Sequence, residues 1–259
     1  MDISRDAAAG PARRHLDLRI PTEFASPLPT GAAKRTVEVL GHRIANDAYP
    51  PGEVMPTEEE LAASLGVSRA TIRDAIKVLS GKGLVRTARR YGTRVRPIEE
   101  WNFLDGDVVE WHDPAHPRIR RIFAETTELR SAIEPAAAAL AALRATPDQL
   151  RELSAAARAI HPGHVDIQAL FAADCQFHVT LLDMTGNNVM RQMRQIILTM
   201  LRVSYEFGVV NPDTEDVSRE GHIAVADAIA ARDPEAARTA MEAMLDRNRS
   251  IAEDYWLKA

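Results

Sequence analysis

Apolar residues recur at helical spacing early in the chain, and this spacing stops where prolines cluster. Val37, Leu40 and Ile44 lie three and four positions apart, which is typical of the buried face of a helix over about residues 34–46. The segment 48–52 contains two prolines, and proline ends a helix because it lacks the backbone donor and restricts the preceding residue. The pattern therefore predicts a short helix followed by a turn.

Two further short helices follow, and capping residues mark their ends. Thr57 and Glu60 form the sequence pattern of a capping box, so a helix is predicted to start there. Gly66 suits the left-handed conformation that ends such a helix, and Ser68 is placed to cap the next helix, over about residues 69–80. Two short helices joined by a glycine turn predict a helix-turn-helix.

After these helices the pattern becomes strand-like. Residues 84–87 and 93–97 are predicted to be two strands, with a turn over residues 89–92 between them. Such a hairpin, directly after a helix-turn-helix, corresponds to a wing. The sequence therefore predicts a winged helix-turn-helix domain over residues 31–98.

The remaining residues differ from this domain in pattern. Residues 1–30 are rich in Ala, Pro and charge without periodicity and predict a flexible tail, whereas residues 117–259 are helical in pattern almost throughout. Breaks near residues 145–147, 161–163, 186–188, 210–212 and 232–234 delimit about six helices of roughly 12 to 28 residues. The predicted N-caps are Thr146, Asp166, Asn187 or Asn188, and Asp233. The predicted fold is mainly α: the winged domain, a linker over residues 99–116, and an all-α antiparallel helical bundle for effector binding and dimerisation.

Charge is distributed unevenly over these parts. The net charge is -5, but residues 69–96 carry nine Lys or Arg against one acid, Asp74. The rest of the chain carries 23 basic and 36 acidic side chains. A basic segment in an acidic protein is typical of a phosphate-binding module, although a solvated basic surface would give the same pattern.

Composition narrows the class of protein further. No apolar run is long enough to cross a bilayer, and the N-terminal residues lack the apolar region of a secretory signal. Cys175 is the single cysteine, so no intrachain disulfide can form. We therefore expect a cytoplasmic protein without a membrane partner. The sequence also lacks a phosphate loop, a dinucleotide-binding motif and an obvious nucleophile constellation, which disfavours an enzyme.

The helix from residue 69 is expected to enter the major groove of DNA. Arg69 and Arg73 lie four positions apart on one face, where a guanidinium can bind a guanine edge, and Thr71 is a secondary candidate. Lys77 and Lys82 are expected to contact phosphate. The predicted DNA-binding residues at the wing tip are Arg89, Arg90 and Gly92.

These motifs resemble the GntR family of transcriptional regulators. The resemblance rests on YPPG at 49–52, MPTEEELA at 55–62, LGVSRATIRDA at 65–75 and GLV at 83–85. It implies a repressor that binds double-stranded operator DNA as a homodimer. One position departs from the family: members usually carry Arg at the position of Glu59, where it touches the DNA backbone. We expect one phosphate contact to be lost there or to be compensated by the wing.

The helical half resembles the FCD effector domain of the FadR subfamily. The resembling stretches include ELRSAIE at 128–134, DCQFH at 174–178, Gly186 with Asn187, and His222. Such domains sense small carboxylates, so the resemblance implies an effector of that class. The linker sequences EWNFLD at 100–105 and VEW at 109–111 resemble those of regulators of sugar-acid catabolism, which favours an aldonate or a uronate.

A divalent metal site is predicted in this half. Asp174 and His178 are four positions apart, so a carboxylate and an imidazole face the same way and can chelate zinc or a similar ion, with His222 as a third ligand. Many FCD domains add a histidine 22 residues beyond the position of His222, where this chain has Met244, a poor ligand for such ions. The alternative is a hydrogen-bonded Asp174–His178 pair without metal.

Arg130, Glu134 and Asn187 are the predicted effector-binding residues. An Arg buried among helices needs an anion, which can be an effector carboxylate or, four positions on, Glu134. Two other functions remain as alternatives. One is a metal-dependent enzyme that uses Asp174, His178 and His222, and the other is a chromosomal protein without an effector.

Overall fold

The structure is a computed structural model that describes residues 18–24, 31–113, 116–160, 166–206 and 217–258. The chain divides into two compact units, residues 22–124 and residues 125–259 together with residues 1–21. We call the first unit the head and the second the helical unit. Most of the predicted tail, and the predicted breaks at 161–163 and 210–212, lie outside the described residues. No helix in the described ranges is both long and apolar enough to span a membrane.

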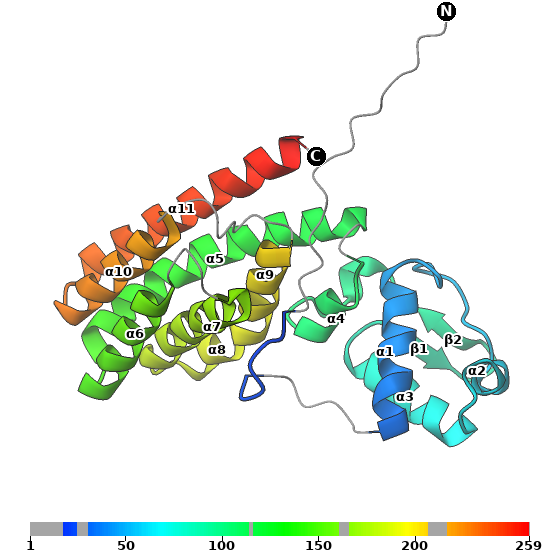
Figure 1. Ribbon diagram of the computed structural model, residues 1–259. Coiled ribbons are helices and arrows are strands. Elements are labelled where there is room, and N and C mark those ends of the chain that lie inside the picture. Colours follow the sequence, from blue (N-terminus) through cyan, green and yellow to red (C-terminus); the bar gives the residue numbers. More distant parts are fainter. Residues whose placement is uncertain (1–17, 25–30, 114–115, 161–165, 207–216, 259) are drawn as a thin grey trace, which may run out of the picture. The chain divides into compact units, whose positions relative to one another are not determined.

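The head contains the predicted winged helix-turn-helix. Its elements, shown in Figure 1, are α1 (Gly31–Ala45), α2 (Glu58–Leu65), α3 (Arg69–Gly81), β1 (Val85–Ala88), β2 (Gly92–Val95), the 3-10 helix η1 (Ile98–Glu100) and α4 (Gly106–Glu110). The first turns of α5 (Pro117–Arg144) also belong to it. The predicted winged fold is confirmed, with element ends within three residues of the predicted ones.

Local capping explains why α2 and α3 begin and end where they do. The Thr57 side chain accepts from the Glu60 backbone N–H, and the Glu60 carboxylate accepts from Thr57 N at 2.7 Å, so the predicted capping box is present. Gly66 ends α2 with a φ of 64°, in the left-handed region. Ser68 Oγ accepts from Thr71 N at 3.1 Å and starts α3.

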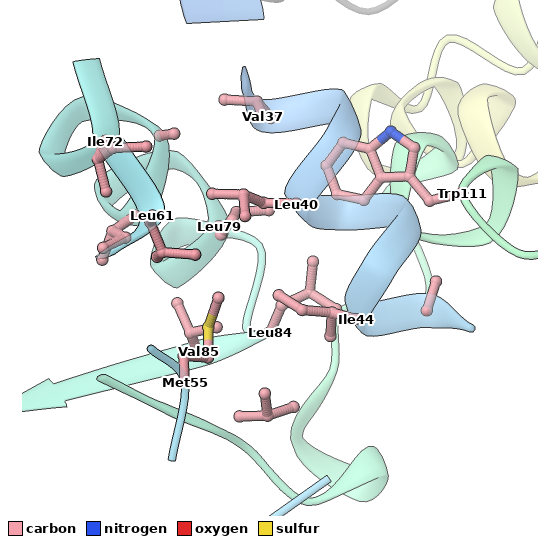
Figure 2. Close-up of a cluster of buried hydrophobic side chains, with 14 of the residues drawn as sticks. Val37, Leu40, Ile44, Met55, Leu61, Ile72, Leu79, Leu84, Val85 and Trp111 are labelled. Carbon is pink, nitrogen blue, oxygen red and sulfur yellow. The ribbon is translucent and has the colours of Figure 1, made fainter. Parts of the chain in front are cut away.

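The amphipathic faces of these helices meet in one core. Val37, Leu40 and Ile44 of α1 are fully buried, as the spacing predicts. They pack with the inner residues of α2, α3 and β1 and of the turn before β1, which include Leu61, Ile72, Leu79, Leu84 and Val85 (Figure 2). This core fixes α3 with its opposite face turned outward.

The wing is an antiparallel hairpin held by a third segment. Val85 pairs with Val95, and Ala88 with Gly92. Arg90 and Gly92 have φ values of 72° and 75°, so the tight turn uses the left-handed region twice. Met55 N donates to Thr93 O at 2.8 Å, which ties β2 to the chain just before α2.

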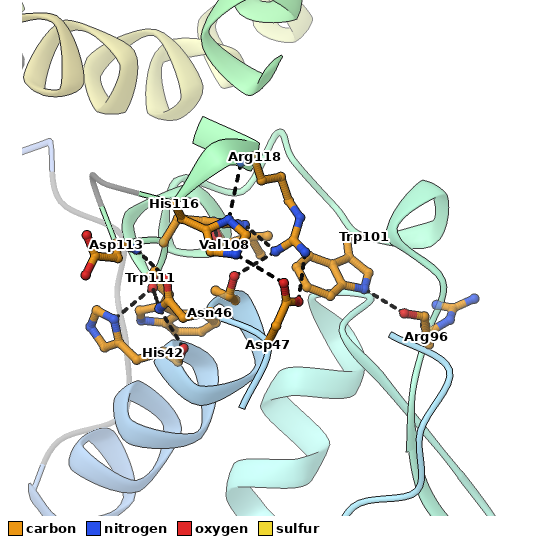
Figure 3. Close-up of polar contacts among 12 residues, drawn as sticks. His42, Asn46, Asp47, Arg96, Trp101, Val108, Trp111, Asp113, His116 and Arg118 are labelled. Carbon is orange, nitrogen blue, oxygen red and sulfur yellow. Dashed lines mark hydrogen bonds and ion pairs between the residues drawn. The ribbon is translucent and has the colours of Figure 1, made fainter. Parts of the chain in front are cut away.

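Residues of the predicted linker pack against the head. The Trp111 ring lies against Gly41 of α1 so closely that a Cβ at position 41 would be 2.3 Å from it. The Trp111 carbonyl lies 2.8 Å from His42 Nδ1 and accepts from Asn46 Nδ2 at 2.8 Å (Figure 3). Trp101 is 5% exposed and belongs to the same core. This segment is thus folded, with η1 and α4 inside it.

Arg118, at the start of α5, closes the end of α1. Its guanidinium donates to the Ala45 carbonyl at 2.7 Å and to Asp47 Oδ1 at 2.8 Å (Figure 3). It also lies 3.3 Å from Nε2 of the buried His112, whose Nδ1 lies 2.9 Å from the Val108 carbonyl. Burial and the nearby Arg118 charge lower the pKa of His112 to about 4, so the imidazole is neutral near pH 7.

The helical unit is all-α in its described residues. It contains most of α5, followed by α6 (Pro147–Ala159), α7 (Ile167–Met184), α8 (Asn188–Gln192), α9 (Arg194–Glu206), α10 (Val217–Ala230) and α11 (Pro234–Lys258). The predicted N-caps Thr146, Asp166, Asn187 and Asp233 all accept backbone hydrogen bonds. The short α8 was not predicted. Helix α7 packs against α6 and α9, and α10 packs against α6 and α11, which brings α7 and α10 into one bundle.

Candidate functional site

The outward face of α3 carries most of the predicted DNA-binding residues. Arg69, Arg73 and Lys77 are exposed and lie four positions apart, so they form one basic stripe. Thr71 is half-buried, and its hydroxyl lies 2.8 Å from Ser68 Oγ, so this side chain also serves the helix start. The stripe has the position and chemistry of a recognition helix.

Each cation of this stripe lies beside a carboxylate. Arg73 Nε donates to Glu58 at 2.7 Å, and Lys77 Nζ donates to Asp74 at 3.0 Å. Arg69 Nη1 lies 3.7 Å from Glu59 Oε2, with both side chains more than half exposed. Exposed pairs of this kind contribute little to stability, so the cations remain available to a stronger anion.

The wing tip presents a second set of exposed groups. Arg89, Arg90 and Gly92 are all exposed, as expected for residues that reach DNA, and Tyr91 between them is 76% exposed. The turn of the wing therefore presents two exposed arginines, Arg89 and Arg90, and the exposed ring of Tyr91.

Lys82 corrects one prediction. A phosphate contact was expected, but Lys82 is only 8% exposed, and its ammonium donates to Asp105 at 2.7 Å and Asp107 at 2.6 Å. These acids belong to the predicted linker, so the lysine fastens that segment to the end of α3. It is not placed to meet DNA.

In the helical unit, the predicted metal ligands come together. Asp174 and His178 of α7 and His222 of α10 are all buried. Asp174 Oδ1 lies 3.3 Å from His178 Nε2 and 3.2 Å from His222 Nε2, and the three ligand atoms lie within 4.8 Å of one another. We call these three residues the Asp–His–His cluster.

A second layer of buried polar groups surrounds the cluster. Glu134 of α5 lies 3.0 Å from His178 Nδ1, and Tyr205 of α9 donates to Asp174 Oδ2 at 3.2 Å. Arg130 Nε donates to Glu134 at 2.6 Å, and an Arg130 Nη2 atom lies 3.3 Å from His178 Nε2. The internal ion pair considered from the sequence is therefore present, and it adjoins the cluster.

The electrostatics of this region follow from its mixed charges. Burial alone would raise the pKa of Glu134, but Arg130 and His178 lower it to about 2. Burial also opposes ionisation of Asp174, yet hydrogen bonds and charges of His178 and His222 hold its pKa well below the usual range. Burial would lower the pKa of His178, but the Glu134 and Asp174 carboxylates raise it. Both carboxylates are thus ionised, and they lie among the Arg130 guanidinium and an imidazole, His178, whose protonated form they favour.

The donors fit a divalent cation. Two ligands that each lie about 2.1 Å from a zinc ion at a near-tetrahedral angle are roughly 3.4 Å apart. The Asp174–His178 and Asp174–His222 separations of 3.3 and 3.2 Å match that spacing. Glu134 beside His178 Nδ1 is also the kind of carboxylate that orients a metal-bound imidazole.

Three other predicted or notable residues lie elsewhere in this unit. Asn187 uses its side-chain oxygen to accept from Val189 N and Met190 N, so it caps α8. Met244 of α11 is buried and packs on α10 at Gly221, where a Cβ would be 2.8 Å from Met244 Cγ. Cys175 is buried, and burial raises its pKa, so it is a packed thiol.

A basic winged helix-turn-helix together with a helical unit that holds a buried polar cluster is the architecture of a DNA-binding transcriptional regulator. Residues 32–95 match the family described as bacterial regulatory proteins, gntR family, and residues 125–247 match the FCD domain. The chain belongs to the GntR family, in the group whose helical unit is an FCD domain.

Curated relatives agree with this assignment over most of the chain. The galactonate operon transcriptional repressor of Escherichia coli is 31% identical over 217 residues, which cover 82% of this chain and 92% of the relative. The HTH-type transcriptional repressor NanR of Citrobacter rodentium is 33% identical over 221 residues, which cover 81% of this chain and 80% of the relative. Among solved structures, Escherichia coli McbR/YncC has a TM-score of 0.51 at 18% identity and covers 88% of this chain and 100% of its own. That last likeness supports the fold.

Proposed function

We propose that the protein is a cytoplasmic transcriptional repressor that releases its operator when a small carboxylate binds the helical unit. As a homodimer it binds a palindromic operator through Arg69, Arg73 and the wing. A sugar acid, with an aldonate or a uronate favoured, binds at the Asp–His–His cluster and weakens operator binding. The relative named for the galactonate operon supports this effector class, since galactonate is an aldonate.

The observation that carries the proposal is a set of ionisable side chains buried together inside the helical unit. Arg130, Glu134, Asp174, His178 and His222 are each less than 9% exposed. Burying charged groups is costly even when they pair with one another, so such a set supports a binding role for this place. The FCD match over the same residues supports an effector site there.

Asp174, His178 and His222 would hold a divalent cation, zinc or a similar ion. When bound, this ion supplies a Lewis acid to which a carboxylate ligand can attach. Met244 stands where another histidine would complete the ligand set, so three protein ligands leave positions open for water or an effector. Affinity for the ion is expected to be lower than with four protein ligands.

The chain's own residues define how the effector would be held. Glu134 accepts from Nε and Nη2 of Arg130 at 2.6 and 3.4 Å, so the remaining donors of the guanidinium would bind the effector carboxylate. Glu134 holds His178 in orientation. Tyr205 holds Asp174 Oδ2, which leaves Oδ1 turned toward the two imidazoles.

A thermal-shift series on the full-length protein tests the proposal. Galactonate, gluconate, galacturonate and glucuronate are compared with neutral galactose, each with zinc and with a chelator, and the metal content of the purified protein is measured. A ligand at about 100 times its Kd stabilises by roughly 2.7 kcal/mol, which raises Tm by about 5–10 °C for a unit of this size. At least one sugar acid should give this shift and also reduce binding to an operator selected from random duplex DNA.

Matched variants on α7 separate the site from the fold. Asp174→Asn should lose both bound metal and the sugar-acid shift. Asp183→Asn removes a carboxylate from the same helix at a half-exposed pair with Arg191, and it should keep both. If no acid shifts Tm, or if Asp174→Asn behaves like the wild type, the effector site is elsewhere and the proposal fails.

A further inference from the structure

Glu59 is the residue of the head that the DNA-binding function does not explain. It is an exposed acid in the first turn of α2, and it lies beside Arg69 of the outward stripe of α3, where DNA should bind. Its carboxylate reaches the Arg69 guanidinium at 3.7 Å. A negative side chain at this place repels phosphate, so it needs a different partner when the head meets DNA.

The chemistry of a carboxylate restricts that partner. An ionised Glu has only acceptors, and the DNA backbone also has only acceptors at its charged oxygens. In the major groove, the exposed donors are the amino groups of cytosine and adenine. Glu59 can therefore gain a bond from DNA at a base edge and nowhere on a phosphate.

The neighbouring Arg69 indicates whether Glu59 binds the amino group of cytosine or that of adenine. A guanidinium binds the two major-groove acceptors of guanine, N7 and O6. The edge of a G·C pair continues from these acceptors to the amino donor of cytosine, whereas an A·T pair presents acceptor, donor and acceptor in turn. The Arg69–Glu59 pair offers donors and then an acceptor side by side, which is the complement of G·C.

We propose that Arg69 and Glu59 read one G·C pair together, with Arg69 on guanine and Glu59 on the cytosine amino group. This inference rests on the proposed operator binding by α3. The exposed ion pair costs little to rearrange, so Glu59 does not lock Arg69 away from DNA. In this arrangement Glu59 makes no phosphate contact, and it contributes instead to base recognition through the cytosine amino group.

Selection from a random-core duplex library tests this proposal on the full-length protein. The wild type should enrich a palindrome with a G·C pair at the position where Arg69→Ala loses its preference. Glu59→Ala should lose about tenfold of the preference for G·C over A·T at that same position and keep the rest of the palindrome. Its affinity for unrelated duplex DNA should stay the same or rise, because a repulsive charge is removed.

Asp74→Ala is the matched control, since Asp74 is an exposed acid on α3 that pairs with Lys77 at 3.0 Å. It removes the same charge and should leave the base preference at that position unchanged. In a second test, that cytosine is replaced by pyrimidin-2-one, which lacks the amino group. The wild type should bind this duplex about tenfold more weakly than the unmodified one, whereas Glu59→Ala should bind the two duplexes with equal affinity.

The experiment distinguishes failure of the Glu59 contact from failure of operator binding. If the wild type selects a palindrome and Glu59→Ala keeps its full G·C preference, or if the analogue weakens both proteins alike, the Glu59 contact is refuted. If the wild type selects no sequence, operator binding itself fails.

Discussion

Glu134 offers the sharpest test of the electrostatics inside the helical unit. Its carboxylate is fully buried and pairs with Arg130 at 2.6 Å. Glu134→Gln keeps the shape of the side chain but leaves the buried Arg130 without its nearest counter-charge. Breaking a buried pair in this way typically costs about 3–5 kcal/mol.

The pKa of Glu134 gives an independent magnitude. Its fall from 4.5 to about 2 means that the surroundings favour the ionised form. At about 1.4 kcal/mol per pKa unit, this preference is roughly 3 kcal/mol. Both routes therefore predict that Glu134→Gln destabilises the helical unit by about 3 kcal/mol.

Calorimetry of the full-length protein with a chelator present measures this loss. A loss of about 3 kcal/mol should lower the transition of the helical unit by roughly 6–12 °C and leave the transition of the head in place. The double variant Arg130→Met/Glu134→Leu should recover most of the loss, because an apolar pair replaces a desolvated ionic one. A loss below about 1 kcal/mol, or a double variant no more stable than Glu134→Gln, would refute the reasoning.

Two further predictions concern Met244 and His112. Met244→His should raise zinc affinity at least tenfold in competition with a chelator, because it supplies an imidazole where the family usually has one, and an unchanged affinity would show that position 244 does not reach the ion. For His112, the folded-state pKa of about 4 lies below the ordinary 6.5, so its contribution to stability is complete above about pH 6.5 and is lost as the pH falls toward 4. The loss should be about 2 kcal/mol at pH 5 and should approach about 3 kcal/mol below pH 4. Urea unfolding followed by tryptophan fluorescence at pH 7.5 and 5 should show the loss of about 2 kcal/mol in the wild type but much less in His112→Gln. Equal pH dependence in both proteins would contradict this assignment.

Features set by neighbouring residues could be predicted from the sequence. The capping box of Thr57 with Glu60 and the cap at Thr146 depend on residues three positions apart, and both are present. The same is true of the Arg130–Glu134 pair and the shared face of Asp174 and His178. In each case helical spacing alone fixes which groups meet.

Features set by distant residues could not be predicted in this way. Lys82 resembles a phosphate contact until Asp105 and Asp107, more than 20 positions further on, are seen to enclose it. The pairing of Arg69 with Glu59 depends on how α2 crosses α3, and the burial of His112 depends on the docking of its segment. Local pattern carries no information on such tertiary contacts.

Residues 99–111, which follow the wing and pack on the head, affect where the chain can be cut without exposing the core of the head. Trp101, Val108 and Trp111 are part of the hydrophobic core of the head. Lys82 forms ion pairs with Asp105 and Asp107, which follow the wing in sequence. A fragment cut at residue 98, where the winged motif ends in sequence, would expose the face of α1 at Gly41 that Trp111 covers and would leave the buried Lys82 ammonium without its carboxylate partners. A chimeric repressor that keeps this head intact should therefore include residues up to about 124, where the compact unit ends. A different effector domain should be fused to it within α5.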